Sequence, residues 1–272
     1  MELLLNNLPT LAALIGTGVV AGLLAGLLGV GGGIVIVPIL YFLFQGFGVS
    51  ADSAMVIATA TSLATIVPTS ISSIRAHRKK GNVDFELLKV WGVFILIGVL
   101  AGSYLVTRVN GQFLTTLFGV IATLSALNMM FARKTAMFEG LPGKAGQASM
   151  GTSVGLFSSL VGIGGGTLTV PMLTFCNYPA HKAVGTAAAV GLIISLPAAI
   201  TMLVLGVTPI DAPLGTFGLV NLVGFVCIVP LTVLFAPIGA HLASKLDAAK
   251  LKKVFAVVLL ITGLRMLAQL FL

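Results

Sequence analysis

Charged residues are scarce in this chain. They make up 8% of its 272 residues, whereas 58% are hydrophobic and the mean hydropathy is +1.14. A soluble domain carries about a quarter charged residues, and no run of 40 residues here is polar enough to form a separate aqueous domain. We therefore expect a chain embedded in the lipid bilayer along its length. Its apolar runs are continuous, which favours membrane helices over the alternating strands of a membrane barrel.

Acidic residues are missing from the predicted membrane segments. All seven fall in loops or at segment ends: Glu2, Asp52, Asp84, Glu86, Glu139, Asp211 and Asp247. A cation site or a carboxylate proton relay normally places at least one acidic residue inside the helix bundle. This absence disfavours a cation pump and suits an anionic substrate that is held by neutral donors.

Catalytic and metal-binding patterns are also missing. Cys176 and Cys227 lie in separate apolar runs without a Cys-x-x-Cys or Cys/His spacing, so we predict neither a metal site nor a disulfide. The arrangements that an intramembrane protease needs are not found, and no Gly-Lys-Ser/Thr string follows the glycine-rich segments. We expect no enzyme activity, no ATP hydrolysis and no cofactor.

Lys and Arg are confined to a few short stretches, although the net charge is +8. Residues 1–74 and 183–244 contain neither. Such clustering is typical of topology signals in membrane proteins. The most basic loop, at 75–80, has no interleaved aromatic residues of the kind that a nucleic-acid stacking surface needs. We therefore expect the bilayer as a partner and no nucleic acid.

Two related halves are visible in the sequence. Segment 27–40 aligns with segment 160–173 at an offset of 133, with 8 of 14 positions identical, and both contain Gly-x-Gly-Gly-Gly-x-x-x-Val-Pro. A second set of matches, at an offset of 137, follows in the same order near the ends of the halves. We interpret this as a duplication, with a first transmembrane repeat at 1–132, a cytoplasmic connecting loop at 133–147 and a second repeat at 148–272.

Each half contains five hydrophobic segments. They are predicted at 8–30, 34–45, 51–74, 87–107 and 112–131, and again at 148–163, 167–177, 181–205, 215–244 and 254–272. The second segment of each half is too short to cross a hydrocarbon layer of about 30 Å at 1.5 Å per residue. We predict that these two are re-entrant arms or parts of broken helices.

An odd number of crossings per half inverts the second half relative to the first. The loop charges agree, because 13 of the 15 Lys and Arg residues fall on one side, Arg108 falls on the other and Arg265 lies in the last helix. The positive-inside rule makes the basic side cytoplasmic and places both termini outside. The predicted fold is an all-α polytopic membrane protein of two inverted-topology repeats, whose glycine-rich hairpins meet near the midplane.

The two glycine-rich strings form the centre of the predicted substrate site. Irregular backbone at membrane depth is tolerated only where it is buried in protein or lines a cavity. The short helix that follows each string presents unpaired amides that favour an anion. The other interpretation is that the glycines only permit close helix packing and that the prolines only end a turn.

Hydroxyl groups are the predicted neutral donors. Thr61, Ser62 and Thr186 are preferred because each follows its hairpin closely, although many such hydroxyls bond to the preceding turn of their own helix. The other candidates are Thr59, Thr65, Thr167 and Thr169. The three histidines, His77, His181 and His241, are expected to be solvated or interfacial.

The motifs resemble those of the TauE/SafE family of sulfite exporter-like permeases, in the toluene-sulfonate uptake permease superfamily. The matching strings are Gly29–Leu40, Ala60–Leu63, Ile66–His77, Gly162–Gly166 with Val170 and Pro171, and Ala183–Ala187. The resemblance covers nearly the whole chain. It implies a multi-spanning inner-membrane transporter of sulfite, sulfoacetate or other organosulfonate or carboxylate anions.

The family motifs, together with the hydroxyl argument, complete the predicted binding set. It comprises Gly31, Gly32, Gly33, Pro38, Thr61, Ser62, Gly164, Gly165, Gly166, Thr167, Pro171, Gly185 and Thr186. One departure is that Ala60 precedes Thr61 where Gly185 precedes Thr186, so the two hydroxyl sites differ. We predict a secondary transporter of a small anion that works by alternating access. A passive anion channel is the alternative, and the anion, the direction, the coupling ion and the oligomeric state are left open.

Overall fold

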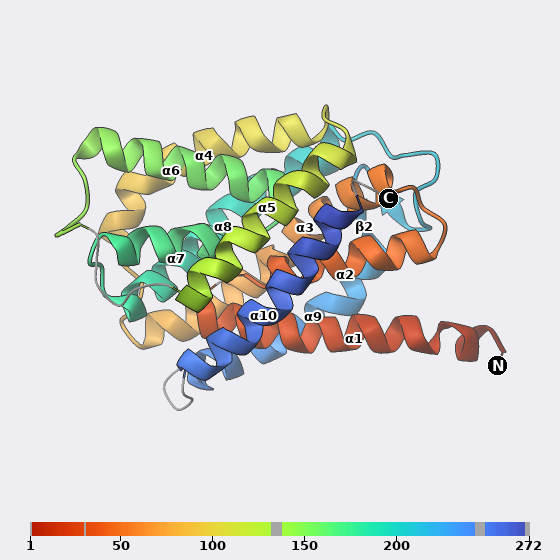
Figure 1. The fold of residues 1–272 in the computed structure, drawn as a ribbon, viewed down its shortest axis with the longest axis horizontal. Coiled ribbons are helices and arrows are strands. Elements are labelled where there is room, and N and C mark those ends of the chain that lie inside the picture. Colours follow the sequence, from red (N-terminus) through yellow and green to blue (C-terminus); the bar gives the residue numbers. More distant parts are fainter. Residues whose placement is uncertain (1, 30, 132–137, 243–247, 270–272) are drawn as a thin grey trace.

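The computed structural model describes residues 2–29, 31–131, 138–242 and 248–269 (Figure 1). These residues form ten helices and one two-stranded hairpin. The first half contains α1 (Glu2–Leu28), α2 (Gly33–Gly46), α3 (Ala51–Lys79), α4 (Phe85–Val106) and α5 (Gly111–Phe131). The second half contains α6 (Lys144–Val161), α7 (Gly166–Phe175), α8 (Ala180–Val204), β1 (Thr216–Phe217), β2 (Val220–Asn221), α9 (Leu222–Leu242) and α10 (Ala248–Ala268).

The all-α polytopic fold is confirmed. Among the described residues, five helices are long and apolar enough to cross a bilayer, namely α3, α4, α5, α8 and α9. Their outward faces carry exposed apolar side chains, such as Leu100, which is 50% exposed, and Val226, which is 63% exposed. A lipid environment removes the free-energy cost of exposing such a surface to water.

The two short segments are also found. α2 has 14 residues and α7 has 10, which corresponds to about 21 Å and 15 Å of helix. Each follows a break in the preceding long helix at the glycine-rich string. Gly31, Gly32 and Gly162 have φ angles of 74°, 78° and 74°, a left-handed conformation that glycine adopts without a steric penalty.

The helices pack in a pattern that is unchanged when the two halves are exchanged. α1 packs along α9 and α6 packs along α4, so the first helix of each half lies against the fourth helix of the other half. α3 packs on α8, and α5 packs on α10. Figure 1 shows the α4–α6 pair along one edge of the molecule and the α1–α9 pair along the opposite edge. A duplication predicts this exchange symmetry.

Glycine permits close packing in both of the long helix pairs. A Cβ on Gly22 of α1 would lie 2.8 Å from the Thr232 Cα of α9, and a Cβ on Gly98 of α4 would lie 2.1 Å from the Thr152 carbonyl of α6. Small residues let membrane helices approach in this way. The packing interpretation therefore holds for these glycines, which lie outside the two strings.

Several predicted boundaries are wrong. α3 continues to Lys79 instead of ending at 74, so Arg75, Arg78 and Lys79 lie within a helix, where cations are favourable near the C-terminus. α9 begins at Leu222 instead of 215, because β1 and β2 form a hairpin between 216 and 221. α6 and α10 begin at 144 and 248, earlier than predicted. Four residues used in the topology and charge predictions, Arg133, Lys134, Lys245 and Asp247, lie outside the described residues.

Candidate functional site

The two glycine-rich strings touch each other at equivalent positions. A Cβ on Gly31 would lie 3.1 Å from the Cα of Gly164, its counterpart at the offset of 133. A Cβ on Gly33 would lie 2.5 Å from the carbonyl oxygen of Gly162. Only glycine leaves room for two backbones to approach this closely. At the Gly31–Gly164 contact, the two strings therefore meet at positions that the duplication makes equivalent.

Each string also packs against the third helix of the opposite half. A Cβ on Gly29 would lie 2.4 Å from the carbonyl of Val184 in α8, and one on Gly162 would lie 2.8 Å from the Cα of Thr59 in α3. Ser62 strengthens the second contact, because its hydroxyl donates a hydrogen bond of 2.7 Å to the Gly162 carbonyl. Ala187 stands at the position equivalent to Ser62, so only one of the two contacts has this bond.

Ile66 of α3 fills the space beside the point where the two strings meet, which we call the crossing. Its side-chain atoms would lie 3.2 Å from a Cβ on Gly31 and 2.8 Å from a Cβ on Gly33. Ile66 is fully buried. Its counterpart in α8 is Gly191, so the two sides of the crossing differ in bulk.

Thr61 and Thr186 occupy equivalent positions away from the crossing. The Thr61 hydroxyl accepts a hydrogen bond of 2.8 Å from the Asn221 amide, and the Thr186 hydroxyl accepts one of 3.0 Å from the Asp84 amide. Asn221 and Asp84 each stand at the N-terminus of the fourth helix of the opposite half. These threonines therefore connect the halves, and each retains a hydroxyl hydrogen that it can donate.

The remaining predicted residues are spread around the crossing. Gly32 packs against Ala21 of α1, and Gly165 packs against Val190 and Ile194 of α8. Gly185 packs against Asn82 in the α3–α4 loop. Gly166 and Thr167 begin α7, and Thr65 bonds to the Ser62 carbonyl in its own helix. Pro38 and Pro171 lie within α2 and α7.

Sequence reasoning missed three buried serines, of which Ser70 and Ser158 lie near the second string. The hydroxyls of Ser70, Ser158 and Ser195 are buried and have no hydrogen-bond partner. A signal was available for two of them. Ser70 and Ser195 are 125 positions apart, the same separation as Thr61 and Thr186, and so occupy equivalent positions on α3 and α8.

The prediction for His77 is wrong. The side chain is 3% exposed, and its Nε2 lies 3.0 Å from the carbonyl oxygen of Gly26 in α1. It is buried because α3 extends past the predicted end of the segment and packs against α1 there. His181 and His241 are exposed, as predicted.

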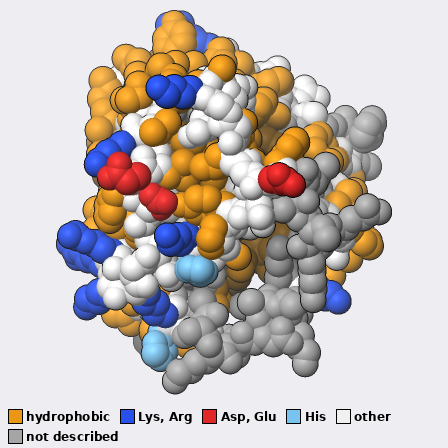
Figure 2. Space-filling model, turned by 90° about the vertical axis from the view of Figure 1, so that its left-hand side faces the viewer, with side chains coloured by type: hydrophobic (Ala, Val, Ile, Leu, Met, Phe, Trp, Pro, Cys, Tyr) orange, Lys and Arg blue, Asp and Glu red, His pale blue; other side chains and the backbone are white. Residues whose placement is uncertain are grey.

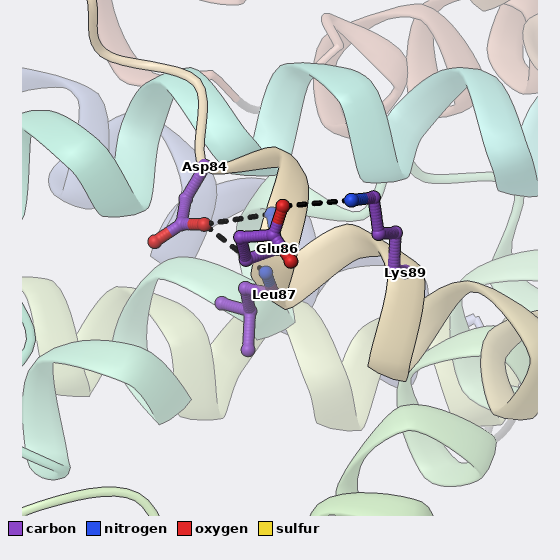
Figure 3. A network of polar contacts seen from close by, with 4 residues as sticks. All are labelled: Asp84, Glu86, Leu87 and Lys89. Carbon is purple, nitrogen blue, oxygen red and sulfur yellow. Dashed lines mark hydrogen bonds and ion pairs between the residues drawn. The ribbon is translucent and has the colours of Figure 1, made fainter.

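A carboxylate joins two loops at the end of the molecule that carries the start of α4. The Asp84 Oδ1 accepts hydrogen bonds of 3.0 Å from the amides of Glu86 and Leu87, and thereby caps α4 (Figure 3). Its Oδ2 accepts a hydrogen bond from the Tyr178 hydroxyl in the α7–α8 loop. We call this contact the Asp84 latch. The Tyr178 and amide hydrogen bonds hold the pKa of Asp84 below its usual value, so the latch contains an ionised carboxylate.

A second carboxylate joins two loops elsewhere in the chain. The Asp211 Oδ1 accepts a hydrogen bond of 2.6 Å from the Ser53 hydroxyl, and its Oδ2 accepts one of 2.8 Å from the Ser50 amide. These bonds lower the pKa of Asp211 to about 2. We call this contact the Asp211 latch. It connects the α8–β1 loop of the second half to the α2–α3 loop and to the first turn of α3 in the first half.

A pocket of about 200 Å³ lies beside the Asp211 latch. It is lined by the start of α3, the α4–α5 loop and the α8–β1 loop, including Asp52, Ser53 and Asn110. The Asp52 carboxylate accepts a hydrogen bond of 2.8 Å from the Gln112 amide at the start of α5. The pocket therefore has an acidic wall that is fixed by hydrogen bonds.

The opposite face of the molecule is basic. Figure 2 shows Lys and Arg side chains gathered around the face that lies at the left of Figure 1. The exposed basic residues at the end of α3, directly after it and at the start of α8 include Arg78, Lys79, Lys80 and Lys182. Lys89 forms an exposed ion pair of 2.7 Å with Glu86 (Figure 3), a type of contact that stabilises little.

Within the described residues, no three His, Cys, Asp or Glu side chains gather closely enough to hold a metal ion. Cys176 and Cys227 are both free thiols. The buried polar groups around the two strings are hydroxyls and backbone amides. Such groups can hold an anion through hydrogen bonds.

The known proteins with similar sequences are named as transport proteins. The model of the family described as "Sulfite exporter TauE/SafE" matches residues 14–266. A Haemophilus influenzae protein named "Probable membrane transporter protein" is 30% identical over 254 residues, which cover 92% of this chain and 95% of that protein. Similar proteins from Methanocaldococcus jannaschii and Bacillus subtilis, also named probable membrane transporter proteins, are 28% and 27% identical over 94% and 93% of this chain and 95% of their own length.

No solved structure matches the chain. The family match covers both glycine-rich strings and all the predicted binding residues. The sequence resemblance is thereby confirmed. The chain is a membrane protein of transporter type and belongs to the TauE/SafE sulfite exporter family.

Proposed function

We propose that the chain is a secondary transporter that moves a small anion across the cytoplasmic membrane by alternating access. The substrate class is sulfite, an organosulfonate or a related sulfur-containing or carboxylate anion, in line with the family description. One observation carries the proposal: Gly31 and Gly164, at equivalent positions of the two strings, are in contact between two short broken helices. Short, interrupted segments at corresponding positions of two repeats are typical of a transporter's substrate site.

The proposed topology is inverted. The basic end of the molecule faces the cytoplasm, and both termini lie outside. The beginning of α1 and the end of α10 both lie in the right-hand half of Figure 1, and the basic face lies on the left, which supports this orientation. In this arrangement α2 and α7 enter from opposite sides, and the two strings meet between them.

Alternating access needs a closure at each end of the substrate path. The Asp84 and Asp211 latches are suited to this role, because each joins a loop of one half to a loop of the other. Opening one latch separates the two segments that it joins at that end while the string contact stays in place. The exchange symmetry of the helix pairs supports equivalent opening motions at the two ends.

Flux measurements in proteoliposomes test this function. We expect purified protein to exchange radiolabelled sulfite for unlabelled sulfite inside the vesicle, with uptake that is accelerated by internal substrate. A carrier shows this trans-acceleration. Single-channel conductance far above a carrier's turnover would instead identify a passive anion channel. No flux of any sulfur-containing or carboxylate anion in a folded preparation would contradict the proposal.

Two substitutions test the strings as the site. Gly32→Leu and Gly165→Leu place a large side chain where Ala21 and Val190 leave no room. We expect both to abolish substrate binding in protein that still inserts and purifies as a monodisperse species. Transport at the wild-type rate in both variants would exclude the strings.

A further inference from the structure

Buried hydroxyls without hydrogen-bond partners lie on the elements that pack around the second glycine-rich string. Six such side chains are at most 7% exposed. They are Thr59, Ser70, Ser158, Thr167, Thr169 and Ser195. A buried hydroxyl is costly unless it is hydrogen-bonded. Six of them on adjoining elements indicate a lining that is completed by a polar ligand.

Backbone contacts and chain position place four of these residues beside the string. Gly162 lies directly on Thr59, because a Cβ on Gly162 would be 2.8 Å from the Thr59 Cα. The Ser158 carbonyl accepts a hydrogen bond of 3.1 Å from the Ile163 amide. Thr167 and Thr169 lie in the first turn of α7, directly after the string ends. All four residues are therefore held around the same short segment.

Ser70 and the second string both lie against Gly191, which has no side chain. A Cβ on Gly191 would lie 2.9 Å from the Ser70 hydroxyl and 4.0 Å from the amide nitrogen of Gly165. The hydroxyl of α3 and an amide of the string thus approach each other across Gly191. Ser195 follows one turn later on the same helix, at the position equivalent to Ser70.

Four other helical hydroxyls among the described residues do have a partner, whereas Thr123 of α5 also lacks one. Thr69, Thr115, Ser159 and Thr174 each donate to a carbonyl one turn earlier in their own helix, at 2.7 to 2.9 Å. That local bond is the usual arrangement for Ser and Thr in a membrane helix. The hydroxyls around the second string lack it.

The first string has no comparable set. At the offset of 133, Ala25, Ile34 and Ile36 take the places of Ser158, Thr167 and Thr169. The start of α2 is therefore apolar where the start of α7 carries two threonines. The donors are concentrated on one side of the crossing.

We propose that the hydrogen-bond donors of the anion site lie around the second string, and that the ligand is a compact oxyanion such as sulfite. Its oxygens accept hydrogen bonds from Ser70, from Thr169 and from the leading amides of α7, whose dipole also favours a negative charge. Several donors from different directions suit a ligand with several acceptor oxygens. The packing is tight, since a Cβ on Gly165 would lie 2.4 Å from Val190, and this favours a small ligand over an extended organosulfonate.

This inference rests on the transporter function proposed above and assigns its substrate site. The probe is sulfite, with binding measured by calorimetry on the full chain in detergent. We expect Ser70→Ala and Thr169→Val each to weaken sulfite binding by roughly 10- to 100-fold, the loss for one hydrogen bond to a charged group. The unfolding temperature without ligand should not fall, because neither hydroxyl bonds to the protein.

Matched controls exist on the same and the neighbouring helix. Thr174→Val, in α7, and Ser159→Ala, in α6, remove hydroxyls that bond to their own helices. We expect both controls to bind sulfite like the wild type. Thr169→Ser, which keeps a hydroxyl, should restore most of the affinity that Thr169→Val loses.

The outcomes separate this inference from the transporter function. Unchanged sulfite affinity in both Ser70→Ala and Thr169→Val overturns the site assignment. The transporter function stands in that case if the wild type carries sulfite. A wild type that carries sulfoacetate and does not bind sulfite overturns the compact-oxyanion class alone. If a variant loses affinity and the matched control loses it equally, the effect is one of packing, and the assignment is wrong.

Discussion

The Thr61 hydroxyl accepts a hydrogen bond of 2.8 Å from the backbone amide of Asn221, which belongs to the other half of the chain. The equivalent bond joins Thr186 to Asp84. Both threonines are predicted substrate ligands, and each accepts from the amide of the residue directly before a fourth helix, across the interface between the halves. A structural role and a binding role therefore coexist as hypotheses for the same hydroxyls, and they predict different measurements.

Thr61→Val should destabilise the folded protein by about 1–3 kcal/mol, because the Asn221 amide is left buried without an acceptor. Thr186→Val should cost less, since Asp84 is only half-buried. Chemical unfolding in detergent measures both. Thr61→Ser keeps the acceptor and should restore most of the stability. Wild-type stability with lost substrate affinity in Thr61→Val would show that the hydroxyl acts on the ligand instead.

Gly33→Ala should separate the two strings. The added methyl would lie 2.5 Å from the Gly162 carbonyl oxygen, and a backbone atom cannot move aside cheaply. Overpacking of this kind costs about 1–3 kcal/mol, and we expect transport to be largely lost. Gly46→Ala, at the other end of the same helix, meets nothing within 4 Å and is the matched control. Equal transport in the two variants would contradict a functional crossing.

Some features of this fold could be predicted from the sequence because they depend on local chemistry. The doubled Gly-x-Gly-Gly-Gly string predicted both helix breaks, and the short apolar runs after it predicted α2 and α7. The end of α3 could not be placed, since basic residues occur both in loops and in the last turn of a helix. The 216–221 hairpin was missed because it is only two residues long on each side.

The polar interior was harder to predict. The burial of His77 depends on how α3 packs on α1, which no local pattern encodes. The partners of Thr61 and Thr186 lie more than a hundred residues away in sequence. Whether a hydroxyl bonds to its own helix, as Thr174 does, or lacks a partner, as Thr169 does, follows from packing and not from residue type.

Acid should weaken the Asp211 latch. The pKa of Asp211 is about 2 in the folded protein, below the usual value of about 3.9 in an unfolded chain. A carboxylate whose pKa is lowered by folding stabilises the folded state at pH values above its unfolded pKa. This contribution disappears as the pH falls from about 4 to 2. Asp211→Asn should flatten this part of the stability profile, measured as unfolding temperature against pH. A variant with the full wild-type acid dependence would show that other groups cause it.

The inverted topology predicts which residues a membrane-impermeant reagent can reach. Single cysteines introduced at Lys79 and Lys144, in a chain without Cys176 and Cys227, should be protected in intact cells and labelled only after permeabilisation. A cysteine at Arg108 should react from outside, as should tags at both termini. A C-terminal tag that is accessible only from the cytoplasm would contradict the inverted topology. It would therefore also contradict the entry of α2 and α7 from opposite sides of the membrane.

The described membrane helices contain no buried carboxylate that could carry a proton with the substrate. A negative-inside membrane potential drives an anion outward with about 2.3 kcal/mol per charge and 100 mV, so export needs no coupling residue. We therefore expect Asp52→Asn, Asp84→Asn, Glu86→Gln and Asp211→Asn, one at a time, to retain substantial sulfite flux in proteoliposomes with an imposed potential. Asp84→Asn and Asp211→Asn should change the rate most, because they weaken the two latches. Complete loss of flux in one of these variants, in folded protein with normal sulfite binding, would identify that carboxylate as a coupling group and contradict transport driven by the potential alone.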